Sequence, residues 1–293
     1  MRILITGAGG QLASDVRRVC ADDDVTALSH AELDVSDEAA VVEAVHAARP
    51  EVVCNLAAWT DVDGCEGDPD RAHESNALGP WWLARACRRS GAVLVHLSTD
   101  YVFGGSPAVG PDGTPRPWSE TDAVDPRSVY GRSKAAGEQL IRDTLTEHVI
   151  VRTAWLAGTG GPNFVRTMLR LGHEGAPVTV VDDQFGSPTF TADLAPAIRH
   201  LAVARRYGTF HVANEGRASW FELAAATFEL AGLEVSLSPQ PSSALERPAP
   251  RPAWSVLDTR HARLAGMPPL PPWRQGLRRL LGELGELRTA GPA

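Results

Sequence analysis

The sequence predicts an α/β fold: a doubly wound parallel sheet with a smaller, discontinuous C-terminal lobe. Three observations support this. Short apolar runs alternate with helical patterns over residues 1–155, a glycine-rich turn follows the first run, and the pattern becomes irregular beyond residue 155. Strand and helix in regular alternation predict βαβ units with right-handed crossovers, which build a parallel sheet covered by helices on both faces.

The elements of the first half follow one another in order. Each apolar run is short enough for a strand, and a run without polar alternation is typical of a strand buried on both faces. We expect strands at 2–6, 25–28, 52–56, 93–98 and 149–155, and helices at 11–20, 37–48, 76–89 and 128–145. Residues 1–155 are therefore expected to form a Rossmann-type domain.

The alternation is interrupted by a segment, 104–127, that is rich in Gly, Pro, Asp and Ser and has no period, which predicts a loop. A loop this long in a compact domain is usually functional or mobile. Beyond it we expect helices at 164–171, 192–204 and 220–231, strands at 178–181 and 210–213, and proline-dense stretches at 239–252 and 268–272. Residues 156–293 are expected to be mostly a substrate-binding lobe, with some elements returning to the first domain.

Composition excludes several classes of protein. A net charge of -8 without an extended basic run argues against a nucleic-acid partner. No stretch approaches the ~20 apolar residues of a membrane span, and Gly7 to Gly10 interrupt the apolar start, which indicates a strand and turn instead of a signal peptide. The four cysteines lack C-x-x-C spacing and interleaved histidines, so neither a disulfide framework nor a metal site is expected. We expect a cytoplasmic protein, monomeric or homodimeric.

The glycine-rich turn lies between the first strand and the first helix. Glycines there let the backbone approach a pyrophosphate, whose charge is met by free N–H groups and by the positive end of the helix. Ala13 stands at the third position of the fingerprint, where close packing of helix on strand needs only a small residue. A tight turn without a ligand is the alternative, but the position at the first βα junction favours a nicotinamide dinucleotide. Contacts are expected from Gly7, Gly10, Gln11 and Leu12.

The end of the second strand bears on the choice of coenzyme. Folds that prefer NAD usually place an acid there for the ribose 2′-hydroxyl, whereas this chain has Ser29 and His30. Neither would repel a 2′-phosphate, so NADPH is expected in preference to NADH. The next acid, Asp34, is expected to face the adenine or to cap the next helix. Further cofactor contacts are expected from Val35, Ala57, Ala58 and Thr60.

A tyrosine and a lysine four residues apart are the clearest chemical signal. Tyr130 and Lys134 fall on a predicted helix, where this spacing puts both side chains on one face. A nearby ammonium favours the phenolate, so we expect Lys134 to lower the pKa of Tyr130 and make it a usable acid near neutral pH. A solvated surface helix is the alternative. Ser98 and Thr99, which end the fourth strand, would face the same edge of the sheet, and Ser98, Tyr130 and Lys134 are also expected to contact the cofactor.

Together these motifs resemble the extended short-chain dehydrogenases/reductases, and within them the dTDP-4-dehydrorhamnose reductases. The resemblance spans almost the whole chain, and the order and spacing of its short motifs are specific. It is carried by 7–12, 55–63, 98–103, 130–134, 152–155, 163–165, 183–189, 251–252 and 255–258.

The resemblance implies roles for particular residues. Thr99 would bind the substrate carbonyl, Tyr130 would donate the proton, and Lys134 would hold the nicotinamide ribose while the coenzyme reduces a 4-keto sugar at C4. Substrate contacts would come from Thr99, Asp100, Tyr101, Arg152, Trp155, Asn163 and Gln184. Core burial of Trp155, loop capping by Asn163 and Gln184, and a structural ion pair at Arg152 are the alternatives. Some members bind magnesium at a dimer interface; here Asp15 and Asp193 are expected to be surface carboxylates, with no metal.

Other activities remain open from sequence alone. The segment after Phe103 is longer than the family pattern, which leaves the exact sugar open: dTDP-4-dehydro-L-rhamnose, or the substrate of a cousin such as dTDP-dihydrostreptose synthase. Dehydratases and epimerases share the cofactor turn and the Tyr-Lys pair, but dehydratases carry an Asp-Glu pair where this chain has Asp100 and Tyr101. A non-catalytic regulatory subunit of this superfamily would lack the pair that Tyr130 and Lys134 provide.

Overall fold

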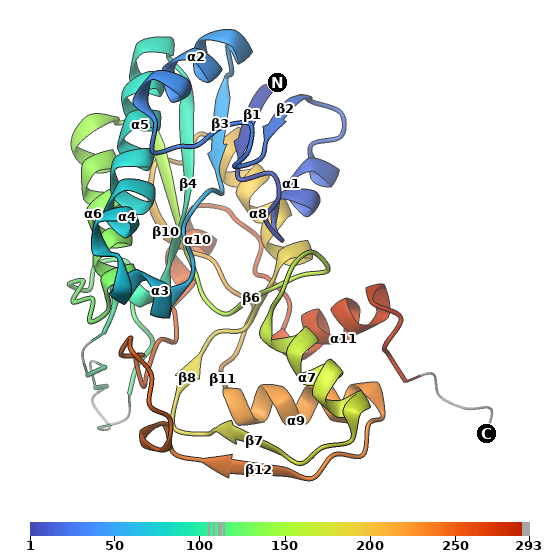
Figure 1. Cartoon of the computed structure of the whole chain (residues 1–293). Coiled ribbons are helices and arrows are strands. Elements are labelled where there is room, and N and C mark those ends of the chain that lie inside the picture. Colours follow the sequence, from blue (N-terminus) through green and yellow to red (C-terminus); the bar gives the residue numbers. More distant parts are fainter. Residues whose placement is uncertain (105, 108, 111–112, 114, 289–293) are drawn as a thin grey trace.

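The computed structural model describes residues 1–104, 106–107, 109–110, 113 and 115–288 (Figure 1). Its centre is a six-stranded sheet in the order β10-β5-β4-β3-β1-β2, with every neighbouring pair parallel. The strands are β1 (Arg2–Thr6), β2 (Asp24–Leu28), β3 (Val52–Asn55), β4 (Val93–Thr99), β5 (His148–Thr153) and β10 (Gly208–His211). The expected α/β class and parallel sheet are confirmed.

Helices cover both faces of this sheet (Figure 1). On one face α1 (Ala13–Val19) and α8 (Thr191–Val203) pack over an apolar cluster that includes Ile5, Val95 and Ile198. On the other, α2 (Glu38–Ala48), α5 (Gly79–Ser90) and α6 (Val129–Thr144) pack over a cluster that includes Leu4, Leu94 and Ile141. Strands β1, β3, β4 and β5 are buried on both faces along most of their length, which is why their sequences lack polar alternation, whereas the edge strand β2 is half-buried or exposed.

Helix α6 matters most for the site. Ser128 caps its start, accepting a hydrogen bond from the Gly131 amide at 3.0 Å. Tyr130, Lys134, Glu138 and Ile141 are buried and recur every three or four residues, so one stripe of the helix faces the sheet. This stripe carries three ionisable groups into the interior of the protein.

A second layer of structure lies at the carboxyl edge of the sheet. Helices α7 (Phe164–Glu174) and α9 (Trp220–Ala231) pack on each other and on the strand pair β7 (Val178–Val181) and β12 (Leu237–Gln240), as Figure 1 shows in its lower half. The remaining elements are short: α3 (Val62–Gly67), α4 (Pro69–His73), η1 (Glu74–Leu78), η2 (Asp100–Val102), β6 (Leu156–Ala157), β8 (Phe185–Gly186), β9 (Thr189–Phe190), β11 (Ala218–Ser219), η3 (Ser242–Ala244), α10 (Arg260–Leu264) and α11 (Trp273–Glu283).

Two elements from the second half return to the sheet, β10 as its edge strand and α8 as its cover. The predicted strand at 210–213 is thus β10, which begins two residues earlier. The division at residue 155 into two domains stays a prediction. No helix in the described part of the chain is long and apolar enough to cross a membrane.

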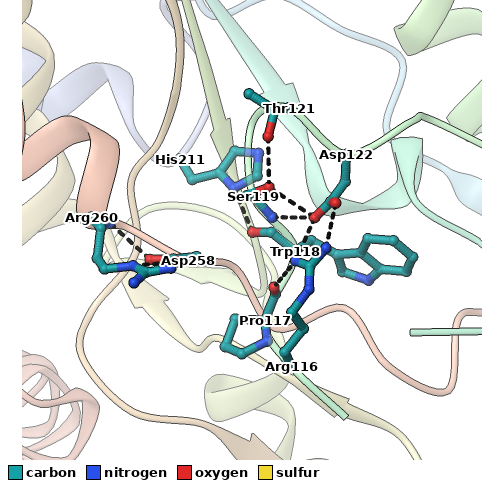
Figure 2. A network of polar contacts seen from close by, with 9 residues as sticks. All are labelled: Arg116, Pro117, Trp118, Ser119, Thr121, Asp122, His211, Asp258 and Arg260. Atoms are coloured by element: carbon teal, nitrogen blue, oxygen red, sulfur yellow. Dashed lines mark hydrogen bonds and ion pairs between the residues drawn. The ribbon is translucent and has the colours of Figure 1, made fainter. Parts of the chain in front are cut away.

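The segment expected to be a loop is fastened at its end to distant parts of the chain (Figure 2). Arg116 and Asp122 form a paired ion contact at 2.8 and 2.6 Å. The Trp118 backbone bonds to Val256 and Asp258, its carbonyl meets the His211 ring at 3.0 Å, and its indole stacks on a neighbouring phenyl ring at 4.8 Å. Positions 105, 108, 111, 112 and 114 of this segment lie outside the described residues.

Candidate active site

The glycine turn lies at the carboxyl edge where β1 sits between β2 and β3, the switch point of the sheet. Gly7 has φ +72, and a Cβ there would lie 2.7 Å from the Ala57 nitrogen, so this position requires glycine. The Gly10 amide donates to the Gly7 carbonyl at 2.9 Å, while no atom would crowd a Cβ on Gly9. The turn is tight and open on one side, a shape that fits the pyrophosphate of a dinucleotide.

The predicted cofactor residues divide into two groups. Gly7, Gly10 and the half-buried Ala57 and Ala58 meet at this edge, and Gln11 donates from its amide to the Leu156 carbonyl at 3.1 Å. Thr60 is exposed nearby in sequence. The side chains of Leu12 and Val35 are instead buried, in the first and second core clusters. At these two positions the side chains serve packing, so a cofactor contact there would come from the backbone and stays a prediction.

The end of β2 also differs from expectation. The Ser29 amide and hydroxyl both donate to the Glu32 carboxylate, at 2.8 and 2.7 Å. An acid therefore stands beside Ser29 after all, contributed by a residue three positions later in the chain. His30 is exposed, and Asp34 accepts from the Ser36 amide and hydroxyl at 3.0 and 2.7 Å, so Asp34 shapes this turn while Asp37 caps α2.

Tyr130 and Lys134 lie one helical turn apart on the buried face of α6, beside the end of β4. The Lys134 nitrogen donates to the Leu97 carbonyl at 2.7 Å and lies 3.2 Å from Nε2 of His96. The Tyr130 ring meets the Tyr101 ring edge to face at 5.6 Å. The Thr99 hydroxyl donates to Asp100 at 3.0 Å and accepts from the Tyr101 amide at 3.2 Å. The three expected catalytic side chains are thus gathered at one edge of the sheet.

The expected lowering of the tyrosine pKa does not occur in this structure. Burial raises the pKa of Tyr130, and hydrogen bonding with Thr99 opposes this only in part. Burial also lowers the pKa of Lys134 to about 8, against the charge of Glu138, which raises it. Both groups lose water on burial, and the Lys134 nitrogen is turned toward Leu97 and His96, so its charge does not offset the burial of Tyr130.

Asp100 is the third unusual group at this edge. Burial raises its pKa to about 6, against hydrogen bonds that lower it, and its second carboxyl oxygen is buried without a hydrogen-bond partner among the described residues. An orphaned buried oxygen costs free energy unless a ligand meets it. Its place beside Thr99 is therefore suited to a polar substrate group.

A cavity of about 670 Å³ opens between this edge and the C-terminal lobe. Tyr101 and Gln184, both expected substrate contacts, lie in its wall. The sequence did not single out most of the others, which include Phe164, Thr167, Trp220, Arg247 and Arg251. Of these, Phe164 and Arg251 stand in motifs of the resemblance, at 163–165 and 251–252. Arg251 is held by two hydrogen bonds to Asp63, at 2.9 and 2.8 Å, so it joins α3 to the cavity wall.

Other expected ligand contacts turn out to hold the protein together. Arg152 is buried at 3% exposure and bonds to Glu138 through Nε and Nη2, which corrects the expectation of a diphosphate contact. Ser98 donates to the same carboxylate at 2.6 Å, so its hydroxyl is also occupied. Asn163 caps α7 through the Arg166 amide at 3.1 Å. Arg152 thus matches its structural alternative and Asn163 its capping role, while ligand contacts of Ser98 and Asn163 stay predictions.

Trp155 was expected either to contact the substrate or to be buried in the core, and its position combines features of both. Its backbone is in the left-handed region at φ 48, a strained conformation for a bulky residue. Its half-buried ring stacks on Trp220 at 3.5 Å, with an angle of 5° between the planes. Because Trp220 lines the cavity, Trp155 supports the cavity wall from behind.

The acids considered for a metal are paired with arginines. Asp15 meets Arg18 at 2.6 Å, and Asp193 meets Arg279 and the Asn214 amide. Both carboxylates are largely buried by these partners, which corrects their description as surface groups. Within the described ranges, His, Cys, Asp and Glu side chains form no group of three placed to hold a metal ion.

A glycine turn at the switch point, with a Tyr-Lys pair and a threonine beside a cavity at the same edge, defines a short-chain dehydrogenase/reductase. The family model described as the RmlD substrate binding domain matches residues 1–286. The dTDP-4-dehydrorhamnose reductase of Streptomyces griseus is 47% identical over 288 residues, covering 94% of this chain and 91% of that protein. This chain belongs to the dTDP-4-dehydrorhamnose reductase family.

Two further comparisons show the range of the family. A crystal structure of the dTDP-4-dehydrorhamnose reductase from Bacillus anthracis str. Ames in complex with NADP has a TM-score of 0.91 and 38% identity, covering 96% of this chain and 99% of that chain. A probable dTDP-4,6-dihydroxy-2-methyloxan-3-one 4-ketoreductase of Streptomyces antibioticus is 44% identical over 287 residues, covering 95% and 94%.

Proposed function

We propose that this protein reduces the C4 ketone of a nucleotide-activated 4-keto-6-deoxy sugar with NADPH, converting dTDP-4-dehydro-L-rhamnose to dTDP-L-rhamnose. The observation that carries the proposal is that Thr99, Tyr130 and Lys134 gather at the end of β4, where the Tyr130 ring packs against Tyr101 of the cavity wall. The glycine turn lies at the same edge of the sheet. The identity of 47% with a dTDP-4-dehydrorhamnose reductase supports the choice of substrate. NADH is the alternative coenzyme, since Glu32 stands beside Ser29.

In this proposal the chain's own groups bind and protonate the sugar. Thr99 and Asp100 hold the oxygen functions of the sugar ring, and Tyr130 donates its hydroxyl proton to the oxygen that forms at C4. Burial keeps Tyr130 protonated until that charge develops, and general acid catalysis is worth about 10²- to 10⁴-fold. Bound NADPH would supply the hydride, held by the Gly7 turn and by Lys134.

The cavity would receive the nucleotide part of the substrate. Gln184, Arg247 and Arg251 bring an amide and two cations to its wall, and guanidinium groups suit diphosphate oxygens. Phe164 and Trp220 offer aromatic surface for a base or sugar. These contacts take the place of Arg152, which the structure commits to Glu138.

A related ketoreductase activity is the second candidate. The relative from Streptomyces antibioticus, at 44% identity, favours a dTDP-sugar ketone other than the rhamnose precursor, as does the long segment 104–127. A 4,6-dehydratase is less favoured because Tyr101 stands where the second acid is needed. A non-catalytic regulatory subunit is less favoured because Tyr130 and Lys134 are both present and together.

The deciding experiment supplies the 4-keto-L-sugar in situ from its 4-keto-D precursor with the 3,5-epimerase. Under the proposal NADPH is oxidised only when the epimerase is present, and the product has the NMR spectrum of dTDP-L-rhamnose. Equal oxidation with the unepimerised precursor would overturn it in favour of the second candidate. Tyr130→Phe, assayed in parallel, shows whether the oxidation is catalysed at this site.

We further propose a cytoplasmic location, supported by four free cysteine thiols, all buried. We also propose that the protein is a monomer or a homodimer. Size-exclusion chromatography with light scattering distinguishes the two.

A further inference from the structure

A row of polar side chains crosses the middle of the sheet beneath the site. Thr6, Asn55 and His96 occupy paired positions on β1, β3 and β4, so their side chains lie on the same face. All three are fully buried. The Thr6 hydroxyl donates to the Asn55 carbonyl oxygen at 2.7 Å, and the Asn55 amide nitrogen lies 3.0 Å from Nδ1 of His96. The row ends at Lys134, 3.2 Å from Nε2 of the same ring.

The direction of each hydrogen bond follows from one fixed donor. The backbone amide of Ala57 donates to the Asn55 carbonyl oxygen at 3.2 Å. A flipped amide would set two donors against each other there, so the NH₂ group of Asn55 faces His96. Nδ1 of His96 must then accept. In a neutral imidazole the other nitrogen carries the proton, so Nε2–H points at Lys134.

The Lys134 nitrogen has two hydrogen-bond neighbours, of which one is an acceptor and the other a donor. The Leu97 carbonyl accepts a hydrogen bond from the Lys134 nitrogen at 2.7 Å. Both the neutral amine and the charged ammonium of lysine can donate this bond. The Nε2–H of His96 can donate only to a nitrogen with a free electron pair, which the amine has and the ammonium lacks. The ionisable groups around Lys134 are His96 on β4 and Tyr130 and Glu138 on α6, and Glu138 is itself bound by Arg152.

We propose that Asn55 and His96 are positioning residues that orient Lys134 and stabilise its neutral amine. Asn55 fixes the tautomer of His96, and His96 offers a donor to the electron pair that Lys134 exposes when it loses a proton. The Thr6 hydroxyl is secondary, because Ala57 alone orients the Asn55 amide. The effect on reduction rests on the proposed function, whereas the protonation of Lys134 does not.

The chain is unusually suited to a direct test, because Lys134 is its only lysine. Protein labelled with ¹³C at the lysine Cε gives a single side-chain resonance, whose shift reports the protonation of Lys134 as pH is changed. For the native chain we expect a midpoint well below the ordinary value of 10.5. His96→Gln can turn an amide oxygen to the ammonium, so its midpoint should rise by about one pH unit or more.

Thr6→Val is the matched control. It removes a hydroxyl from the same row but leaves the Ala57 amide in place, so the midpoint should stay as in the native chain. An unchanged midpoint in His96→Gln, or an ordinary lysine midpoint in the native chain, would overturn the proposal.

A second measurement on the native protein covers the case in which His96→Gln does not fold. ¹⁵N-histidine spectra should show a buried ring protonated at Nε2 and unchanged between pH 6 and 9, whereas protonation at Nδ1 would refute the proposal. If the midpoint shifts as expected but no sugar is reduced, the proposed function fails and this inference stands. If reduction occurs, the alkaline limb of its kcat/KM profile should move with the midpoint.

Discussion

Glu138 holds Arg152 in a two-pronged ion pair, with Nε to Oε1 at 2.8 Å and Nη2 to Oε2 at 2.6 Å, both side chains being buried. Burial alone would raise the pKa of Glu138, but the hydrogen bonds and charge of Arg152 outweigh it and hold that pKa below its ordinary value. The pair joins α6 to β5 and so fixes the helix that carries Tyr130 and Lys134.

Replacing Arg152 by methionine should therefore destabilise the fold. Removing one partner of a buried ion pair typically costs about 3–5 kcal/mol, and here it leaves the Glu138 charge with only the more exposed Arg142 and the Ser98 hydroxyl. Urea denaturation measures the loss. Arg142→Ala is the control, because Arg142 meets the same carboxylate from a more exposed position at 3.1 Å and should cost under about 1 kcal/mol. Equal effects of the two changes would contradict this account.

The stability supplied by Glu138 also has a predictable pH dependence. A carboxyl whose folded pKa is depressed stabilises the fold above its unfolded pKa, and this contribution is lost as pH falls through the folded pKa. The native chain should therefore lose more stability on acidification than Arg152→Met does, because the variant lacks the main group that depresses this pKa and keeps only Ser98 and Arg142. Parallel urea titrations at several pH values compare the slopes.

Tyr130→Phe should lower kcat by about 10²- to 10⁴-fold, equivalent to roughly 3 to 5 kcal/mol, because the phenolic proton is lost while the ring stays packed. Coenzyme affinity, measured by fluorescence titration with NADPH, should hardly change. Turnover near that of the native protein would remove Tyr130 from the role of general acid.

Coenzyme choice should respond to Glu32. Its carboxylate, held by Ser29 at 2.7 Å, stands where a 2′-phosphate would be repelled. Glu32→Gln should raise the ratio of kcat/KM for NADPH to that for NADH, and Ser29→Asp should lower it. A ratio that is insensitive to both changes would show that the coenzyme ribose lies elsewhere.

The buried Asp100 carboxyl should lower the stability of the fold while it is required for activity. Its pKa rises from 3.8 in the unfolded chain to about 6 when buried, so the folded state binds more protons between these values and loses stability as pH rises through them. Asp100→Asn has no ionisable group there and so avoids this loss of folding stability, which amounts to up to about 3 kcal/mol. The variant should gain stability over the native chain between pH 4 and 7 while losing activity. Melting temperatures of the two proteins across that pH range test the gain in stability, and their kcat/KM values test the loss of activity.

Much of the sheet could be predicted because β1, β3, β4 and β5 are buried on both faces and leave continuous apolar runs. Helices α3 and α4 were missed because they are short and polar, and they begin with aspartate caps at Asp61 and Asp68. The two-residue strands β6, β8, β9 and β11 carry no local pattern, since distant partners alone define them.

The site shows the same division between local and distant signals. Tyr130 and Lys134 could be predicted from the sequence because their four-residue spacing puts them on one face of a single helix. The pairing of Arg152 with Glu138, and that of Arg251 with Asp63, depend on how separate elements pack, which no short motif records. The position of Glu32 beside Ser29 depends on a turn conformation. An arginine in a family motif can therefore serve in a structural ion pair as readily as in a ligand contact.

The edge strand β10 imposes an order on how this protein is made. While the ribosome has delivered only residues 1–155, β5 has no outer neighbour and α1 lacks its companion α8. Such a nascent chain would present an open strand edge and an uncovered apolar face, both of which invite aggregation. The first domain can close only after Phe210 has left the exit tunnel, and by then much of the cavity wall has been synthesised too. A truncated gene ending near residue 155 should accordingly give insoluble product.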